Sequence, residues 1–168
     1  NHRLESVKIL PSEGTDNSPE LYGAITANAS SMAEIANPQA KRVFCMAVTA
    51  DKYVTKDGAP SSWSAELDSI IAGVTDGIKK LYVVSAGKVQ FDELKNTQYP
   101  SANINHTIED PGQSWNAITV GAYSNRIQLD DKVFKGWNPI ADVGELCPFS
   151  STSITWDNKW PIKPEILM

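Results

Sequence analysis

The sequence predicts an α/β protein built on a mostly parallel β-sheet, and two observations carry this prediction. Two short runs, 42–48 and 81–86, are almost wholly apolar, which is typical of strands covered on both faces. Segments with helical spacing of apolar residues lie before and between these runs, so strands and helices alternate along the chain. Such alternation favours parallel strands joined by right-handed crossovers. We therefore expect ligands at the carboxyl ends of the strands.

Two further segments are expected to join the sheet. Residues 5–10 alternate polar and apolar side chains, which predicts a strand at the start of the chain. Residues 116–122 form a third apolar run and predict a fourth strand. The segment 90–114 shows little periodicity, and the chain after Tyr123 is rich in loops.

Two helices are expected between these strands. The first begins at Ser18-Pro19, a favourable helix start, and ends at Asn37-Pro38. Its expected buried stripe is Leu21, Ile25, Ala29, Met32 and Ile35. The second begins at Ser61 or Ser62, and Gly73 and Gly77 weaken its end. Its expected stripe is Trp63, Leu67, Ile70, Ile71, Val74 and Ile78.

Composition narrows the class of protein. The 168 residues suit one domain, with 41% apolar and 21% charged residues, as in ordinary globular proteins. The net charge of -5 argues against nucleic-acid binding, which needs a basic surface. No apolar run approaches the roughly 20 residues that cross a bilayer, so we expect no membrane segment.

The cysteines and glycines argue against cofactor and metal sites. Cys45 lies in an apolar run, and we expect a buried free thiol there, while the sequence leaves a disulfide with Cys147 open. No Cys-x-x-Cys or Cys/His cluster is present, so no metal site is expected. The segment 11–16 holds one glycine and two acidic residues, which excludes a phosphate-binding loop after the first predicted strand. We expect no cofactor.

Four stretches in order carry a resemblance to a known family. The sequence L-Y-V-V-S-A-G at 81–87 is similar to the V-V-x-A-A-G-N segment of the subtilisin-like serine proteases, or subtilases. Residues 116–122 resemble the family's V-I-x-V-G-A strand, P-F-S-S at 148–151 its x-F-S-S/N element, and K-P-E-I at 163–166 its K-P-D-I/V element. The resemblance covers nearly the whole chain. Residues 63–65 and 110–116 further suggest a bacterial branch of the family.

The resemblance implies a three-layer α/β/α fold and peptide-bond hydrolysis by a Ser-His-Asp triad. The family carries its catalytic histidine in H-G-T and its serine in G-T-S, and neither motif occurs in these residues. We therefore expect residues 1–168 to be one partial catalytic domain between those motifs, inactive by itself. His2 is expected to be a frayed terminal residue and His106 an ordinary surface or loop histidine. Solvated or turn carboxylates are expected at Asp68, Asp76, Asp110, Asp130, Asp131 and Asp157.

The resemblance also implies a substrate cleft at two strand ends. One wall of the primary specificity pocket is expected at Ala47, Val48 and Thr49, and the opposite wall at Ser85, Ala86 and Gly87. Strand ends can offer backbone groups to an extended peptide, and small side chains leave room for those of the substrate. The alternative interpretation is that small residues simply end two buried strands.

Lys88 departs from the family pattern. The family places an asparagine here, whose amide donates a hydrogen bond to the oxyanion, and losing such a donor costs about 10²–10³ in turnover. A lysine ammonium also donates, but on a flexible and strongly hydrated stem. Three interpretations stay open: a degenerate protease, a weak protease that uses Lys88 as the donor, or a protease with a donor from elsewhere, such as Asn96.

Two functions therefore compete. The first is a serine endopeptidase that acts on polypeptides and whose cleft walls this chain supplies. The second is a pseudoprotease module that binds peptides without hydrolysis. We expect neither nucleic acid nor a membrane as partner, and we expect the chain to self-associate through an uncovered apolar sheet face. The sequence does not settle the cellular location, although for this chain a cytoplasmic one is favoured.

Overall fold

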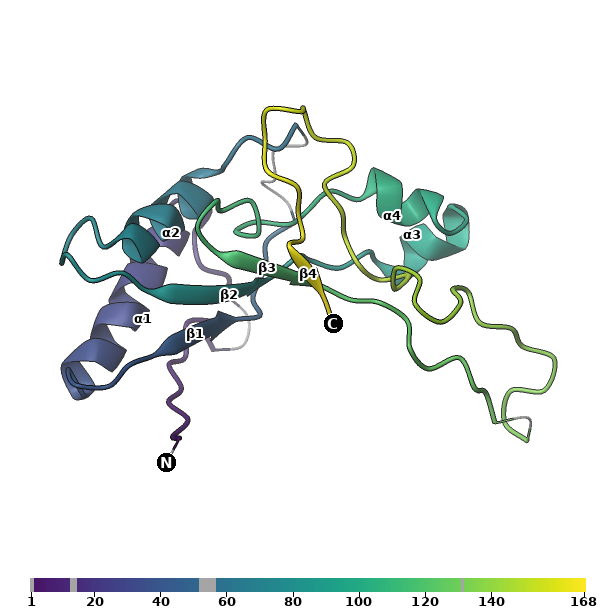
Figure 1. The fold of residues 1–168 in the computed structure, drawn as a ribbon, viewed down its shortest axis with the longest axis horizontal. Coiled ribbons are helices and arrows are strands. Elements are labelled where there is room, and N and C mark those ends of the chain that lie inside the picture. The colour runs from purple at the N-terminus through teal and green to yellow at the C-terminus, as the bar shows by residue number, and fades with distance from the viewer. Residues whose placement is uncertain (1, 13–14, 52–56, 131) are drawn as a thin grey trace.

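The computed structural model describes residues 2–12, 15–51, 57–130 and 132–168 (Figure 1). Among them, four parallel strands form one sheet in the order β1-β2-β3-β4. The strands are β1 (Val43–Met46), β2 (Leu81–Ser85), β3 (Ile118–Gly121) and β4 (Ile166–Leu167). The helices are a 3-10 turn η1 (Pro19–Leu21), α1 (Tyr22–Ala36), α2 (Ser62–Ala72), α3 (Phe91–Asn96) and α4 (Ser101–Asn105). The α/β class and the parallel sheet are thus confirmed.

Three of the four predicted strands are present at the expected places. Cys45 of β1 lies beside Val83 of β2, and Val83 lies beside Ile118 of β3. The fourth strand of the sheet, β4, was not predicted. It begins at Ile166, the last residue of the K-P-E-I element. In this element the buried Lys163 ammonium donates to the Ala117 carbonyl at 3.1 Å and also contacts Glu165.

The predicted strand at 5–10 is wrong. This segment pairs with no strand in the described structure, although it runs near the free edge of β1. Val7 and Ile9 are half-buried, but a cavity separates the segment from β1, so no ladder of backbone hydrogen bonds forms. The alternation of side chains alone was insufficient, because a strand also needs a partner within hydrogen-bonding distance.

Helices α1 and α2 cover the same face of the sheet (Figure 1). Helix α2 starts as predicted: the Ser61 hydroxyl accepts a hydrogen bond from the Ser64 amide at 2.9 Å. It ends at Gly73, whose φ of 71° is the left-handed conformation typical of a helix end. The core under the helices comprises Met46, Trp63, Leu67, Ile71, Tyr82, Val84 and Ala117.

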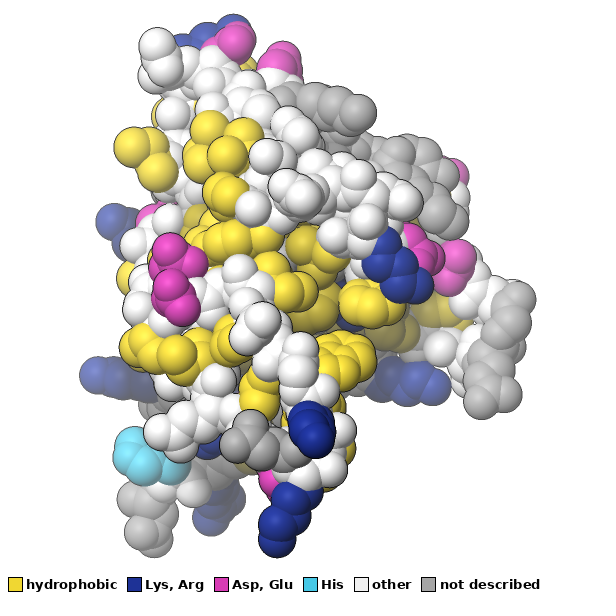
Figure 2. Space-filling view, turned by 90° about the vertical axis from the view of Figure 1, so that its right-hand side faces the viewer, with side chains coloured by type: hydrophobic (Ala, Val, Ile, Leu, Met, Phe, Trp, Pro, Cys, Tyr) yellow, Lys and Arg dark blue, Asp and Glu magenta, His cyan; other side chains and the backbone are white. Residues whose placement is uncertain are grey.

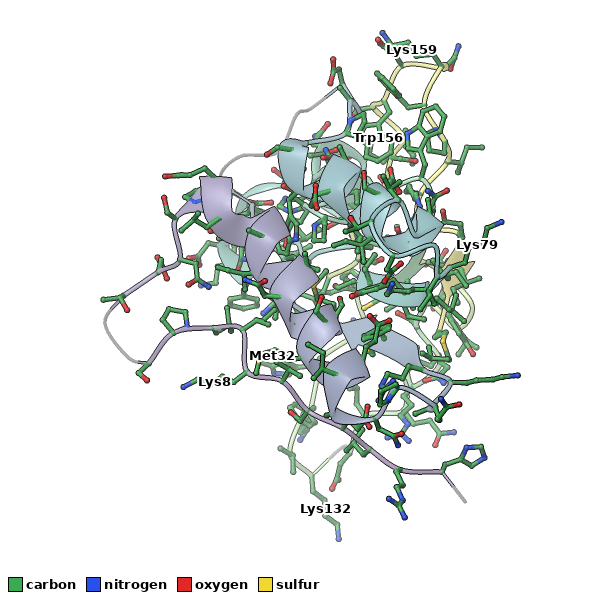
Figure 3. All side chains as sticks on the ribbon, turned by 90° about the vertical axis from the view of Figure 1, so that its left-hand side faces the viewer. Lys8, Met32, Lys79, Lys132, Trp156 and Lys159 are labelled. Atoms are coloured by element: carbon green, nitrogen blue, oxygen red, sulfur yellow. The ribbon has the colours of Figure 1, made fainter. Side chains whose placement is uncertain are left out.

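The predicted buried stripe of α1 is largely wrong. Leu21, Met32 and Ile35 are exposed, and Met32 lies on the outer side of the helix (Figure 3). The buried face instead consists of Thr26, Ser30 and Ala33. The Thr26 hydroxyl accepts a hydrogen bond from the Trp63 indole at 2.9 Å, and Ser30 contacts the Tyr82 hydroxyl. Small polar side chains therefore face the sheet because they meet partners there.

The opposite face of the sheet is uncovered in the described part of the chain. Val43 and Leu81 are exposed on it, and so is Cys45, whose predicted burial is therefore wrong. Both cysteines are free thiols. The predicted stripe of α2 also ends early, since Val74 and Ile78 lie beyond the helix and are exposed.

Helices α3 and α4 and the loops of the C-terminal half lie beyond the carboxyl ends of β1 and β2 (Figure 1). A second small core consists of Ala86, Ile108 and Trp156, with Trp160 packed against it. A long arm, 123–147, projects from this side and is closed at its base by the Ser124 amide, which donates to the Glu145 carbonyl at 2.8 Å. Hydrophobic side chains gather on this face (Figure 2). In the described residues, no helix has the length and hydrophobicity needed to span a bilayer.

Candidate functional site

The two predicted walls lie at neighbouring strand ends. Ala47, Val48 and Thr49 follow β1, while Ser85 ends β2 and Ala86 follows it. Because β1 and β2 are adjacent and parallel, both segments leave the sheet at the same edge. Ala47 is exposed, Val48, Thr49 and Ser85 are half-buried, and Ala86 is buried.

The backbone of the second wall is already hydrogen-bonded within the molecule. The Ala86 amide donates to the Val120 carbonyl at 2.9 Å, and the Ala86 carbonyl accepts from the Glu109 amide at 3.0 Å. Gly87 has a φ of 98°, a conformation that favours glycine, and its amide donates to the Ser85 hydroxyl at 3.1 Å. The amide and the carbonyl of Ala86 are therefore both hydrogen-bonded within the molecule.

A glutamate that the sequence did not single out joins the two walls. Glu109 accepts a hydrogen bond from the Thr49 hydroxyl at 2.5 Å through Oε2, and from the Lys88 amide at 3.1 Å through Oε1. Its side chain is buried, with 4% of the residue exposed. The next residue, Asp110, pairs with Ala50 in both directions, at 2.8 Å and 3.1 Å.

His106 lies between two carboxylates, which corrects its assignment as an ordinary loop histidine. Its Nδ1 is 2.8 Å from Glu93 Oε2, and its Nε2 is 3.3 Å from Glu109 Oε1. Carboxylates only accept hydrogen bonds, so this arrangement suits the doubly protonated imidazolium. The hydrogen bond to Glu109 raises the pKa of His106, with Glu93 adding to the effect and burial opposing it.

The charge of Glu109 is stabilised in the same cluster. Burial alone would raise the pKa of Glu109, but hydrogen bonds from His106, Thr49 and the Lys88 amide outweigh it and lower the pKa. An ionised carboxylate is therefore held between the walls, with its negative charge balanced by His106. The sequence did not predict the contacts of Glu109 and His106, because most of their partners lie far away in the chain. The three-residue spacing of His106 and Glu109 was the one local indication that these two side chains meet.

Two aspartates assigned as solvated or turn carboxylates have structural roles instead. Asp110 is buried and accepts from the Ser61 and Ser64 hydroxyls at 2.5 and 2.8 Å. Burial raises the pKa of Asp110, and the two serine hydrogen bonds oppose the rise. Asp68 accepts from the Ser114 hydroxyl at 2.6 Å and from two backbone amides. Asp131 lies outside the described residues.

Lys88 is exposed and its side chain is directed toward Phe149. The Lys88 ammonium lies 6.0 Å from the centroid of the Phe149 ring, and Lys88 forms a β-bridge with Ser150. The next amide, of Val89, donates to the Phe149 carbonyl at 3.0 Å. Asn96, the alternative donor, is the last residue of α3 and is exposed.

A hollow of about 380 Å³ adjoins the first wall. Val48, Thr49 and Ala50 line one side of it. The rest of the lining is mostly apolar and includes Tyr22, Ile25 and Trp63. Asp16 and Asp51 also belong to the lining. This hollow is large enough for an apolar side chain. Of the predicted wall residues, Val48 and Thr49 line it and residues 85–87 do not.

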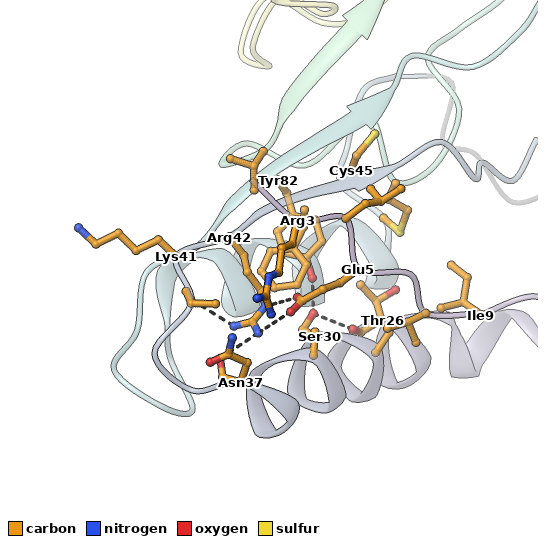
Figure 4. Close-up of a pocket in the computed structure, with 18 of the residues that line it drawn as sticks. Arg3, Glu5, Ile9, Thr26, Ser30, Asn37, Lys41, Arg42, Cys45 and Tyr82 are labelled. Atoms are coloured by element: carbon orange, nitrogen blue, oxygen red, sulfur yellow. Dashed lines mark hydrogen bonds and ion pairs between the residues drawn. The ribbon is translucent and has the colours of Figure 1, made fainter. Parts of the chain in front are cut away.

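A larger cavity of about 680 Å³ lies elsewhere, between the segment that precedes residue 10, α1 and β1 (Figure 4). Arg42 Nε donates to Glu5 Oε2 at 2.6 Å on its lining. That hydrogen bond lowers the pKa of Glu5 and raises the pKa of Arg42. The cavity includes none of the predicted wall residues, so we place the candidate site at the strand ends instead.

The geometry agrees with the comparison against known families. The family model described as the Subtilase family matches residues 1–168. The chain belongs to the subtilase family. A search of curated proteins returned no match. As a subtilase, the chain is a subtilase-type protease domain, and the family implies polypeptide substrates. The described residues of this subtilase hold no group of three or more His, Cys, Asp or Glu side chains placed to bind a metal ion.

Proposed function

We propose that this chain supplies two walls of the substrate cleft of a serine endopeptidase. Residues 47–49 form one wall and residues 85–87 the other. The observation that carries the proposal is that Glu109 joins these two segments at one edge of the sheet. Its carboxylate accepts from Thr49, its amide donates to the Ala86 carbonyl, and the carboxylate also accepts from the Lys88 amide directly after the second wall. Two fixed walls a short distance apart suit an extended peptide, whose side chains then alternate in direction.

The hollow beside the first wall supports the same proposal. Its apolar lining from Tyr22, Ile25 and Trp63 would take an apolar side chain of the peptide, and its position beside Val48 is adjacent to the peptide backbone. The oxyanion position falls on Lys88, one residue after the second wall. The triad groups would come from outside these 168 residues, because the H-G-T and G-T-S motifs are absent from them.

A peptide-binding module without hydrolysis is the second candidate, and Lys88 is the observation that favours it. An asparagine amide at this position would be a neutral and rigid donor, whereas the ammonium of Lys88 is exposed and lies over Phe149. A site that lacks a preorganised oxyanion donor can still bind a peptide while it loses most of its turnover.

One experiment separates the two candidates. The full-length protein is incubated with casein and with a fluorophosphonate probe, and binding of a fluorescent extended peptide is measured by anisotropy. We expect the full-length protein to cleave casein and to be labelled on a serine outside residues 1–168. The 168-residue chain alone should neither cleave casein nor be labelled. Peptide binding without cleavage or labelling would favour the second candidate. Labelling of a serine within these residues would contradict the proposal.

A further inference from the structure

We infer that Glu109 is a positioning residue that sets the distance between the two cleft walls and fixes the backbone at the oxyanion position. This inference rests on the proposed function. The two carboxylate oxygens of Glu109 have separate partners: Oε2 accepts from the Thr49 hydroxyl of the first wall at 2.5 Å, and Oε1 accepts from the Lys88 amide, directly after the second wall, at 3.1 Å. A single side chain thereby connects segments 39 residues apart, between positions 49 and 88.

The backbone around Glu109 reinforces this connection. Its amide donates to the Ala86 carbonyl at 3.0 Å, and the adjacent Asp110 exchanges two hydrogen bonds with Ala50. Through backbone atoms, residues 109 and 110 therefore contact Ala86 of the second wall and Ala50, the residue directly after the first wall. Displacement of Glu109 would move both walls relative to each other.

Gly87 is adapted to the position of this carboxylate. A Cβ atom built on Gly87 would lie 2.5 Å from Glu109 Cγ and 2.7 Å from its Cβ, closer than carbon atoms approach in proteins. The absence of a side chain at 87 thus gives Glu109 the room to reach Lys88. A buried carboxylate also costs free energy unless it is fully hydrogen-bonded, and Glu109 meets that condition with Thr49, Lys88 and His106.

His106 and Glu93 form the charged surroundings of Glu109, and neither residue belongs to a wall. His106 contacts Glu109 at 3.3 Å and Glu93 at 2.8 Å, and Glu93 contacts neither wall in the hydrogen bonds described. The Lys88 ammonium lies over Phe149 rather than at Glu109. Glu93 therefore offers a matched control: it shares the histidine with Glu109 but does not join the walls.

The test compares Glu109→Ala, Glu109→Gln and Glu93→Gln in the full-length protein. Hydrogen exchange at the Lys88 amide and kcat and KM on an extended chromogenic peptide are measured for each. Glu109→Ala should speed exchange at Lys88 by about 10-fold or more, because the amide loses a charged acceptor. It should lower kcat by about 10²-fold with little change in KM, because misplaced reacting groups slow the chemical step.

The conservative variants test positioning rather than simple stability. Glu109→Gln keeps an acceptor for the Lys88 amide and should restore most of the protection and of kcat. Glu93→Gln should leave both near wild type. Unchanged Lys88 exchange in Glu109→Ala, or equal effects of Glu93→Gln and Glu109→Ala, would overturn the inference. Exchange at Thr119 in β3 reports on general loosening and should not change.

Two further arms keep the inference testable. If Glu109→Ala does not fold, Thr49→Val removes one contact of the carboxylate, and it should lower kcat by about 10-fold while Thr49→Ser restores it. Equal activity of the Val and Ser variants would overturn the inference. If the wild-type protein cleaves no peptide but Lys88 exchange responds as expected, the positioning role is supported and the endopeptidase proposal is what fails.

Discussion

The core between the sheet and α2 and the region at the strand ends are held together by different forces. The core is filled by apolar side chains such as Leu67, Val84 and Met46. The strand-end region is joined by buried polar side chains such as Glu109 and Asp110, each with named partners. Apolar contacts are non-directional and tolerate exchange of similar side chains, whereas a buried polar group needs one particular partner.

Asn103 illustrates the polar region. Its side chain is fully buried, and its Nδ2 donates to the carbonyls of Cys147 at 3.0 Å and Ser150 at 2.9 Å. One amide thereby holds the turn that carries the P-F-S-S element, which in turn pairs with Lys88. The difference teaches that the sheet sets where the site lies, while a few polar contacts set its shape.

The largest effect is expected in the apolar core. Leu67 is 0% exposed, and Leu67→Ala should lower the free energy of unfolding by about 2–5 kcal/mol, because it removes buried methyl groups and leaves a cavity. Urea unfolding of the full-length protein measures this change. Ile35→Ala on the exposed side of α1 is the control and should change the free energy by less than about 0.5 kcal/mol. Equal effects at both positions would contradict the assignment of the core.

The second effect concerns turnover at the strand ends. Lys88→Asn in the full-length protein should raise kcat on the order of 10-fold, with little change in KM, because a rigid neutral amide would be a better-preorganised donor to the oxyanion. Confining the lysine side chain costs up to roughly 2 kcal/mol of rotamer entropy, which the amide largely avoids. Lys88→Gln is the matched control and should gain less, since its amide sits on a longer side chain. A fall in kcat for Lys88→Asn would mean that Lys88 is an adapted donor.

The smallest effect is a dependence on pH. The pKa of His106 is raised in the folded protein, so its contribution to stability is complete below the ordinary value of about 6.5 and is lost as the pH rises through the folded value. The pKa of Glu109 is lowered, so its contribution is present above about 4.3 and is lost as the pH falls. The pair therefore stabilises the fold most between these two values.

Urea unfolding of wild type and His106→Gln between pH 5 and 9 measures this dependence. The stability difference between the two proteins should be largest near pH 5–6 and should shrink toward pH 9. A difference that stays constant over the whole range would show that His106 does not carry its charge in the folded protein.

The sheet was predictable from the sequence because its signals are local. The apolar runs placed β1, β2 and β3 within two residues of their observed ends. Ser61, one of two predicted caps, starts α2, but the predicted stripe ran on to Ile78 whereas the helix ends at Ala72. Segment 5–10 shows the limit: its alternation predicts a strand, but whether a strand forms depends on a neighbour that the pattern does not specify. Cys45 shows the same limit, since an apolar run does not reveal which sheet face is covered.

The candidate site was predictable only as two wall segments. The residue types and motifs of these segments placed Thr49 and Gly87 just after two strands. The structure shows that these strands, β1 and β2, are neighbours in the sheet. The contacts of Glu109 join residues 60 apart in one case and 21 apart in the other. No periodicity within segment 90–114 reveals such contacts, because they arise when the loop returns to the sheet edge.

The close approach of Gly87 and Glu109 also restricts the order in which these two positions can change during evolution. Glu109 can shorten without a steric clash while Gly87 stays, although its hydrogen bonds with Thr49 and Lys88 are then lost. Gly87 cannot first acquire a side chain, because its Cβ would lie 2.5 Å from Glu109 Cγ and its φ of 98° would be strained. Substitutions at the two positions are therefore coupled. The steric clash with Glu109 excludes a side chain at position 87 as long as the glutamate is present.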